Sequence, residues 1–128
     1  MTRRFSKVIN VALYAVGVIA LTASLAQAEV RTHWATVHSS GTVEQSSGGV
    51  FVEKTDLGNY LVHVSGEDIN RCAFDATIGS PGDSAPAIGF ITVYFSHTHR
   101  HAFFVNTRTK KGEAADRPFH IVVTCGNT

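Results

Sequence analysis

Three of the seven histidines stand at alternate positions in one short stretch of the chain: His97, His99 and His101. In a β-strand, alternate side chains point to one face, so three imidazoles at this spacing could converge on a transition metal. Zinc and copper sites of this kind need further ligands from other parts of the chain. The spacing selects none of the remaining candidates. These are the carboxylates and the four other histidines, His33, His38, His63 and His120.

The residues around the histidines favour a second interpretation. A continuous strand over residues 95–105 would put the imidazoles in the middle of a face that begins with Phe95 and continues with Phe103. A turn near residues 98–100 removes this conflict, because the two phenylalanines then belong to two paired strands. We therefore predict a hairpin with the histidines exposed at its tip. Adventitious binding of nickel or copper and a true zinc or copper site both stay open there.

Short runs of β-branched and aromatic residues recur from residue 30 onward, separated by Gly, Asn, Asp, Ser and Pro. No sustained helical period interrupts them. The runs predict seven strands, at residues 30–38, 49–54, 59–65, 72–78, 90–96, 102–108 and 119–125. Residues 39–49 read as a polar connection with at most one short strand, and residues 79–89 as a turn-rich crossing. We expect an all-β fold: one small antiparallel β-sandwich or barrel-like domain of about seven or eight short strands.

The N-terminal segment reads as a secretory signal peptide. Basic residues precede an apolar run over residues 8–23, and the small-residue sequence Ala26-Gln27-Ala28 follows it. A membrane anchor is the alternative, but the run is short and is interrupted by a polar residue and a glycine. We therefore expect residues 1–28 to be a signal peptide and residues 29–128 to form a single domain, exported to the periplasm or the cell exterior.

Charge argues against two classes of partner. Without the three basic residues of the N-terminal segment, 8 of the 11 basic residues remain against 10 acidic ones, so the net charge changes from +1 to −2. A slightly acidic domain without a basic patch has no electrostatic basis for binding nucleic acid or anionic membranes. We expect an extracellular or periplasmic ligand or protein as partner, no nucleic acid, and no stable membrane insertion after signal cleavage.

The chain has two cysteines, Cys72 and Cys125, each in an apolar strand-like run. An exported protein with an even number of cysteines is expected to pair them, and alternation puts both on the apolar face of their strands. Two buried free thiols are the alternative, whereas a two-cysteine zinc site is disfavoured because C-x-x-C spacing is absent. We therefore predict a Cys72–Cys125 disulfide, which would constrain the unfolded chain by roughly 4 kcal/mol.

Three segments carry a resemblance to known sequences. They read C-A-F-D-A-T-I-G at residues 72–79, followed by S-P-G, then G-F-I-T-V at residues 89–93 and A-D-R-P-F-H-I-V-V-T-C at residues 115–125. Together they resemble a group of small uncharacterised exported bacterial proteins. The resemblance implies one domain with the same disulfide, and it implies no activity. The histidine stretch departs from the group, which has a short polar turn at that place.

Two single residues could contact a ligand but have structural interpretations that we prefer. Arg117, in Asp116-Arg117-Pro118, could bind an anion. We expect instead that Asp116 caps this turn and that Arg117 pairs with a neighbouring carboxylate. Trp34 could stack against a sugar, but a lone tryptophan in a strand is usually part of the core.

Motifs for catalysis are missing from the sequence. Residues 82–86, G-D-S-A-P, echo the G-D-S-G-G-P around the nucleophile of chymotrypsin-like proteases. The glycine pair that forms the oxyanion hole there is absent, and the domain is about half as long as such a protease. We predict no catalytic and no cofactor-binding residues, and therefore a non-enzymatic binding or structural module. The alternative is a protein that binds zinc or copper through His97, His99 and His101.

Overall fold

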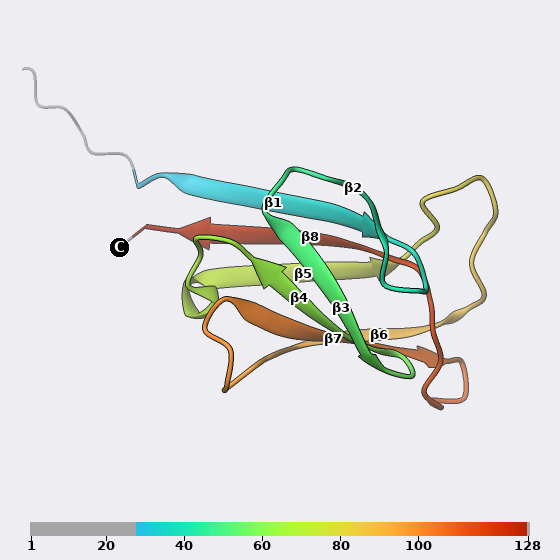
Figure 1. Cartoon of the computed structure of the whole chain (residues 1–128). Helices are drawn as coiled ribbons and strands as arrows, with labels where there is room; N and C mark the ends of the chain where they lie inside the picture. The colour runs from blue at the N-terminus through green and yellow to red at the C-terminus, as the bar shows by residue number, and fades with distance from the viewer. Residues whose placement is uncertain (1–27, 128) are drawn as a thin grey trace, which may run out of the picture.

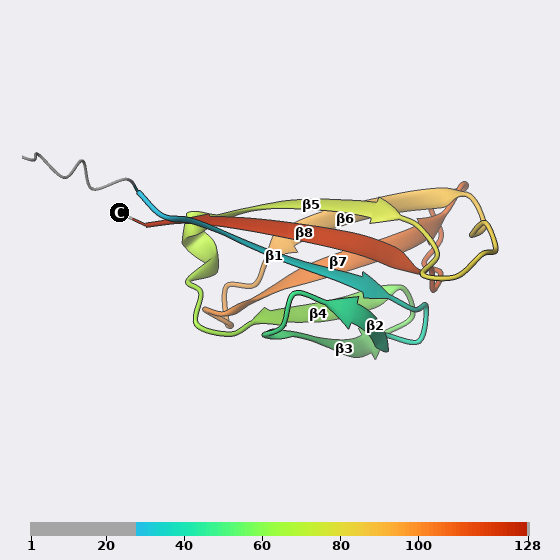
Figure 2. The same ribbon diagram turned by 90° about the horizontal axis from the view of Figure 1, so that it is seen from above.

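The computed structural model describes residues 28–127, which form two β-sheets packed face to face (Figures 1 and 2). Each sheet has four strands, and all neighbouring strands are antiparallel. This arrangement is an antiparallel β-sandwich, so the predicted fold class is confirmed. Residues 1–27 of the predicted signal peptide lie outside the described residues. Within residues 28–127, no helix has the length and hydrophobicity needed to cross a membrane.

The first sheet has the strand order β2-β1-β8-β5. Its strands are β1 (Val30–Val37), β2 (Val43–Ser46), β5 (Cys72–Ile78) and β8 (Phe119–Gly126). β2 is the one short strand expected within residues 39–49. β1 and β8 pair along their whole length, from Val30 opposite Gly126 to Val37 opposite Phe119.

The second sheet has the strand order β3-β4-β7-β6. Its strands are β3 (Val50–Asp56), β4 (Asn59–Val64), β6 (Gly89–Phe95) and β7 (Ala102–Thr109). One turn of 3-10 helix, η1 (Ile69–Arg71), leads from β4 into β5. The seven predicted strands are all present, with ends shifted by no more than about two residues, which is the usual uncertainty of strand boundaries.

Alternation along the strands produces the core between the sheets. In β4, Tyr60, Val62 and Val64 face the other sheet and are fully buried. From β8, Phe119 and Ile121 meet them, and the rings of Tyr60 and Phe119 pack edge to face with centroids 5.1 Å apart. Each side chain of this kind contributes about 1.5–3 kcal/mol when it leaves water, so the inward rows of the two sheets hold the sandwich together.

Trp34 is not part of this core, and the prediction that it would be is wrong. In the same strand, β1, Ala35 and Val37 face the other sheet and are buried. Because successive side chains in a strand point to opposite faces, Trp34 is turned to the outer face, where it is 40% exposed. Its backbone N–H donates to the hydroxyl of Ser47.

Cys72 and Cys125 form the predicted disulfide. The two residues lie directly opposite each other in the pairing of β5 with β8, and both side chains face the core. The bond joins the first residue of β5 to the end of β8, across a sequence separation of 53.

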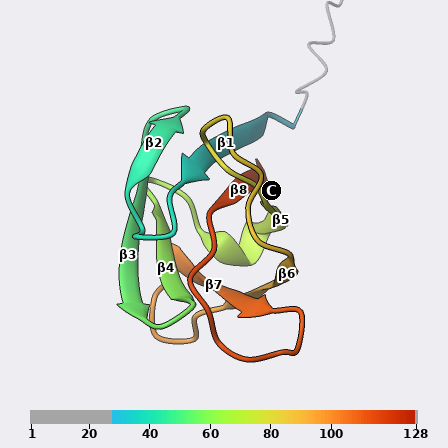
Figure 3. The same cartoon turned by 90° about the vertical axis from the view of Figure 1, so that its right-hand side faces the viewer.

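The connections between strands gather at two opposite ends of the sandwich (Figure 1). One end, here called the bridged end, holds the disulfide, η1 and the turn between β6 and β7. The other, here called the loop end, holds residues 79–88 between β5 and β6 and residues 110–118 between β7 and β8. Figure 3 looks directly at the loop end.

Candidate functional site

The turn between β6 and β7, at the bridged end, carries the three alternating histidines. The two strands pair on either side of it, so the predicted hairpin is confirmed, and all three side chains are exposed. The backbone carbonyls of His101 and Arg100 accept hydrogen bonds from the N–H groups of Val64 (2.8 Å) and Ile69 (3.1 Å). The tip is therefore attached to the end of β4 and to η1.

The three imidazoles have different surroundings. Nδ1 of His99 bonds to two hydroxyl groups of its own turn, and Nδ1 of His101 bonds to the backbone carbonyl oxygen of Glu67. His97 lines a separate hollow on the turn. Within residues 28–127, the set of closely spaced potential metal ligands contains none of the three. The alternating trio therefore does not form one ligand set.

Glu67 is the buried charged residue of the bridged end, only 4% exposed. Its carboxylate accepts two hydrogen bonds from the guanidinium of Arg31, at 2.7 and 2.8 Å, and lies 2.8 Å from Nε2 of His33. The hydrogen bonds from Arg31 are the main cause that lowers the pKa of Glu67 from its ordinary 4.5 to about 2. At neutral pH this group is a shielded, bidentate ion pair, which is an arrangement that fixes chain segments.

The same carboxylate lies close to the disulfide. The ligand atoms of Glu67, Cys72 and Cys125 are all within 4.8 Å of one another, which is a spacing that a metal ion could bridge. The two sulfurs are bonded to each other, so neither is a thiolate, and Arg31 already neutralises the carboxylate. The cluster therefore has a structural role: the disulfide and the ion pair hold chain segments together at the bridged end.

Sequence reasoning did not find Glu67. It lies 36 positions from Arg31 and 34 from His33, and the fold alone brings them together. One signal was available: Arg31 and His33 occupy the same alternating row of β1 as the buried Ala35 and Val37. Basic groups on a core-facing row require a partner, and a carboxylate is the natural one.

The other candidate ligands for the histidine tip lie in different places. Three bond elsewhere: His33 to Glu67, His38 to Glu44 at 2.9 Å, and His120 to the backbone carbonyl of Ser80 at 3.3 Å. The fourth, His63 in β4, lies edge to face with His99, their ring centroids 6.3 Å apart. Of the four histidines that the sequence left as candidates, the structure brings His63 to the tip.

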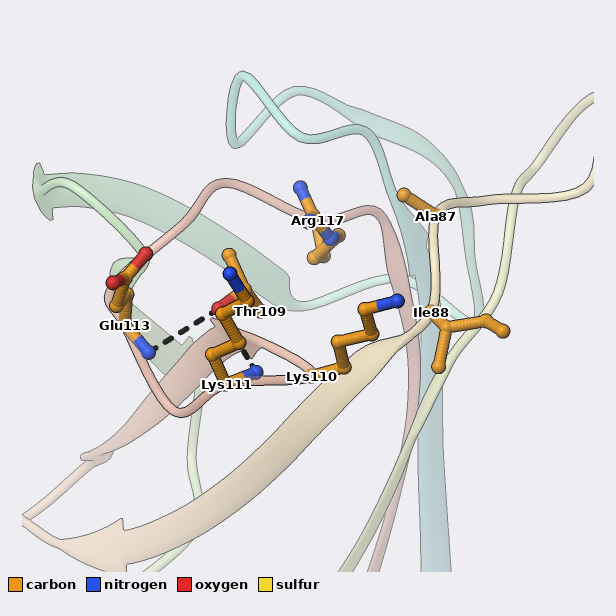
Figure 4. A pocket seen from close by; sticks show the side chains of 7 residues that line it. All are labelled: Ala87, Ile88, Thr109, Lys110, Lys111, Glu113 and Arg117. Atoms are coloured by element: carbon orange, nitrogen blue, oxygen red, sulfur yellow. Dashed lines mark hydrogen bonds between the residues drawn. The ribbon is translucent and has the colours of Figure 1, made fainter.

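The loop end contains a hollow of about 430 Å³ with positively charged walls (Figure 4). Its lining residues come from the two long loops and the end of β7: Ala87, Ile88, Thr109, Lys110, Lys111, Glu113 and Arg117. In Figure 4 the amino group of Lys110 reaches toward Ile88. Because Ile88 is 79% exposed, the hollow combines positive charge with uncovered apolar surface.

A tight turn after β7 positions the two lysines. The hydroxyl of Thr109 accepts hydrogen bonds from the backbone N–H groups of Lys111 (3.2 Å) and Glu113 (3.3 Å), both drawn in Figure 4. The N–H of Thr109 donates to the carbonyl of Glu113 at 2.8 Å. Gly112, with φ +85°, takes the left-handed conformation that lets the chain reverse. Lys110 and Lys111 are thus held on a hydrogen-bonded turn.

Asp116 has a structural role, but it caps the turn between β3 and β4 and not its own turn as predicted, and Arg117 does not form the predicted ion pair. The Asp116 carboxylate accepts from the N–H of Gly58 at 2.7 Å and lies 3.3 Å from Nζ of Lys54. The predicted ion pair of Arg117 is wrong, since within residues 28–127 it has no carboxylate partner and donates only to the backbone carbonyl of Asp116 at 3.1 Å. Its Nε is shielded from solvent and has no hydrogen-bond partner among the described residues.

Unpaired basic side chains concentrate at this end of the described chain. Three basic residues have carboxylate partners: Arg31, Lys54 and Arg100. The other five have none among the described residues, and four of these lie within ten consecutive positions at or next to the loop end: Arg108, Lys110, Lys111 and Arg117. The net charge of the domain did not reveal this grouping, because a net charge does not say where the charges lie; Glu113 is the one acidic residue that lines the same hollow.

No family model, no curated protein and no solved structure matches this chain. The resemblance to a group of uncharacterised exported proteins therefore stays a prediction. What the sites can do has to be argued from their own residues.

Proposed function

We propose that this chain is an exported, non-enzymatic binding module, and that the hollow at the loop end captures small anions that carry a short apolar group. The observation that carries the proposal is the gathering of Lys110, Lys111 and Arg117 around one hollow, without a carboxylate partner for any of them in the described part of the chain. Export is supported by the N-terminal sequence pattern and by the disulfide.

The cations suit a carboxylate or a phosphate. A guanidinium carries a permanent positive charge and several N–H donors. Nη1 of Arg117 donates to a backbone carbonyl and its Nε is shielded from solvent, so Arg117 offers a ligand its charge and its remaining N–H donors. Lys110 and Lys111 add mobile point charges beside it. Glu113 is the one carboxylate among the lining residues, so the walls keep an excess of positive charge.

Ala87 and Ile88 add the apolar part of the recognition. Together they form the wall that residues 79–88 contribute to the hollow. An aliphatic chain attached to the anion would cover Ile88, and each methylene removed from water contributes at most about 0.8 kcal/mol. A ligand such as a short-chain carboxylate therefore fits the hollow better than an inorganic ion.

The test is a titration of the disulfide-bonded domain with acetate, hexanoate and inorganic phosphate, followed by the amide and methyl NMR signals of residues 87–88 and 109–117. We expect hexanoate to bind several-fold more tightly than acetate and its affinity to fall as salt is raised. Equal affinities for acetate and hexanoate would contradict the apolar part of the proposal.

Two variants decide whether the hollow is the site. Lys110→Gln/Arg117→Gln is expected to weaken hexanoate binding by about tenfold or more, because two of the three positive charges that line the hollow are removed. Arg71→Gln is the matched control, since Arg71 is also exposed and without a carboxylate partner in the described chain but lies in η1 at the bridged end. If the control weakens binding as much as the double variant, net charge and not the hollow is responsible.

A further inference from the structure

We infer that Glu53, His63 and His99 form a second binding site, which takes a divalent transition metal such as zinc or copper. Glu53 is in β3, His63 is in β4, and His99 is in the turn between β6 and β7. The site uses one histidine of the alternating trio and completes it with two residues from far earlier in the chain. It is separate from the hollow at the loop end, so each of the two proposals can be tested without the other.

His63 lies between Glu53 and His99, but within residues 28–127 the three are not a group of closely spaced ligand atoms, so binding a metal requires their side chains to move. Nε2 of His63 lies 3.8 Å from a carboxylate oxygen of Glu53. Two ligand atoms that share a tetrahedral zinc, each about 2.0 Å from it, are about 3.3 Å apart, and two imidazoles that share it have centroids about 5 Å apart. The rings of His63 and His99 are 6.3 Å apart. Both separations exceed those of a bound metal, so the proposal requires the exposed side chains to rotate toward one another when the ion binds.

His99 is oriented as metal-binding histidines usually are. Its Nδ1 lies 2.8 Å from the hydroxyl of Ser96 and 2.9 Å from that of Thr98. Partners on one ring nitrogen fix the tautomer and the plane of a ligating imidazole, and leave the other nitrogen for the metal. Ser96 is itself buried, so this anchor is part of the fold.

An ion can reach the site from solvent. The side chain of His63 is 37% exposed and that of Glu53 is 66% exposed. His63 also borders an open hollow of about 440 Å³ that includes Phe51 and His101. Two imidazoles and one carboxylate are ligands that zinc and copper accept, and three protein ligands leave a fourth position for water.

The test is calorimetric titration of the disulfide-bonded domain with zinc chloride and with copper sulfate, for the parent chain and three single variants. We expect one tight equivalent in the parent chain, and at least a tenfold loss of affinity in His63→Ala and in His99→Ala. His97→Ala is the matched control, because His97 is also exposed on the same turn but lines a different hollow. It should keep the equivalent.

Two outcomes would overturn the inference. If His63→Ala leaves the tight equivalent intact, the ion is held by the tip alone. If His97→Ala loses affinity as much as His99→Ala, the alternating trio and not this set is the ligand group. Urea unfolding of each variant, expected to match the parent chain, separates loss of ligands from loss of folding, and NMR line broadening by copper centred on His63 provides a second readout.

Discussion

The two ends of the sandwich differ in whether their charged side chains have partners of opposite charge. At the bridged end, the carboxylate of Glu67 is enclosed by Arg31 and His33, and Asp68 pairs with Arg100 at 2.9 Å. At the loop end, three cations line one hollow, and none of them has a carboxylate partner within residues 28–127. A charge that is enclosed and hydrogen-bonded orders the chain, whereas a charge without a partner is available to a ligand.

Asp116 explains how the loop end comes to have free cations. Its carboxylate is committed to Gly58 and Lys54, and so does not neutralise the neighbouring Arg117. Position 58 requires a glycine, since a Cβ atom there would lie 2.3 Å from the carbonyl oxygen of Thr107. Asp116 therefore secures the turn between β3 and β4, and Arg117 has no carboxylate partner in the described part of the chain.

The largest expected effect concerns the disulfide of the bridged end. Cys72→Ser/Cys125→Ser should lower the free energy of unfolding by roughly 4 kcal/mol, because the bond closes a loop across a sequence separation of 53 and so restricts the unfolded chain. Urea denaturation of the oxidised parent chain and the variant measures this difference. A loss below about 1 kcal/mol would mean that the unfolded chain is already compact near the bridge.

A second, smaller effect is expected for Glu67→Gln. This change removes the shielded charge from Arg31 and His33, and should cost about 2 kcal/mol at pH 7, a typical value for a hydrogen bond to a charged group. Glu44→Gln is the matched control. Glu44 also pairs with a histidine, but both side chains are largely exposed, and the expected cost is below about 0.5 kcal/mol. Equal costs would remove the distinction between enclosed and exposed pairs.

The acid stability of the chain should depend on Glu67 as well. The pKa of this carboxyl is lowered from 4.5 to about 2 in the folded chain, so its contribution is complete above about pH 4.5 and is lost as the pH falls toward 2. The difference in unfolding free energy between the parent chain and Glu67→Gln should therefore shrink across that interval. A difference that stays constant from pH 5 to pH 2 would contradict the role assigned to the ion pair.

The strands and the core of this protein were predictable because they depend on local alternation. The row of Tyr60, Val62 and Val64, and the inward position of both cysteines, follow from a period of two residues. The turn at the histidine tip was predictable for the same reason, since Phe95 and Phe103 both belong on strands. These features need no knowledge of how distant segments meet.

The sites depend on contacts between distant segments, and sequence reasoning placed them only in part. His99 was recognised as a potential ligand, but its neighbour His63 depends on the pairing of β4 with β7, which the strand pattern does not specify. The hollow of Lys110 and Arg117 requires that residues 79–88 fold back over the turn after β7. The net charge of the chain did not reveal this group of cations, because it does not say where the charges lie.

The smallest effect on stability is expected at the loop end, and it tests the contrast most directly. Lys110→Gln/Lys111→Gln should change the free energy of unfolding by less than about 0.5 kcal/mol, because neither lysine has a carboxylate partner in the described chain. Lys54→Gln is the control at the same end. Lys54 lies 3.3 Å from the Asp116 carboxylate, so its loss should cost more, up to about 1 kcal/mol.

Urea denaturation at pH 7 compares the free energies of unfolding of the two variants, and hexanoate titration of the double variant should show weakened binding despite unchanged stability. If the double variant loses more stability than Lys54→Gln, the two lysines hold the loop in place, and the charges of the loop end serve the fold just as those of the bridged end do.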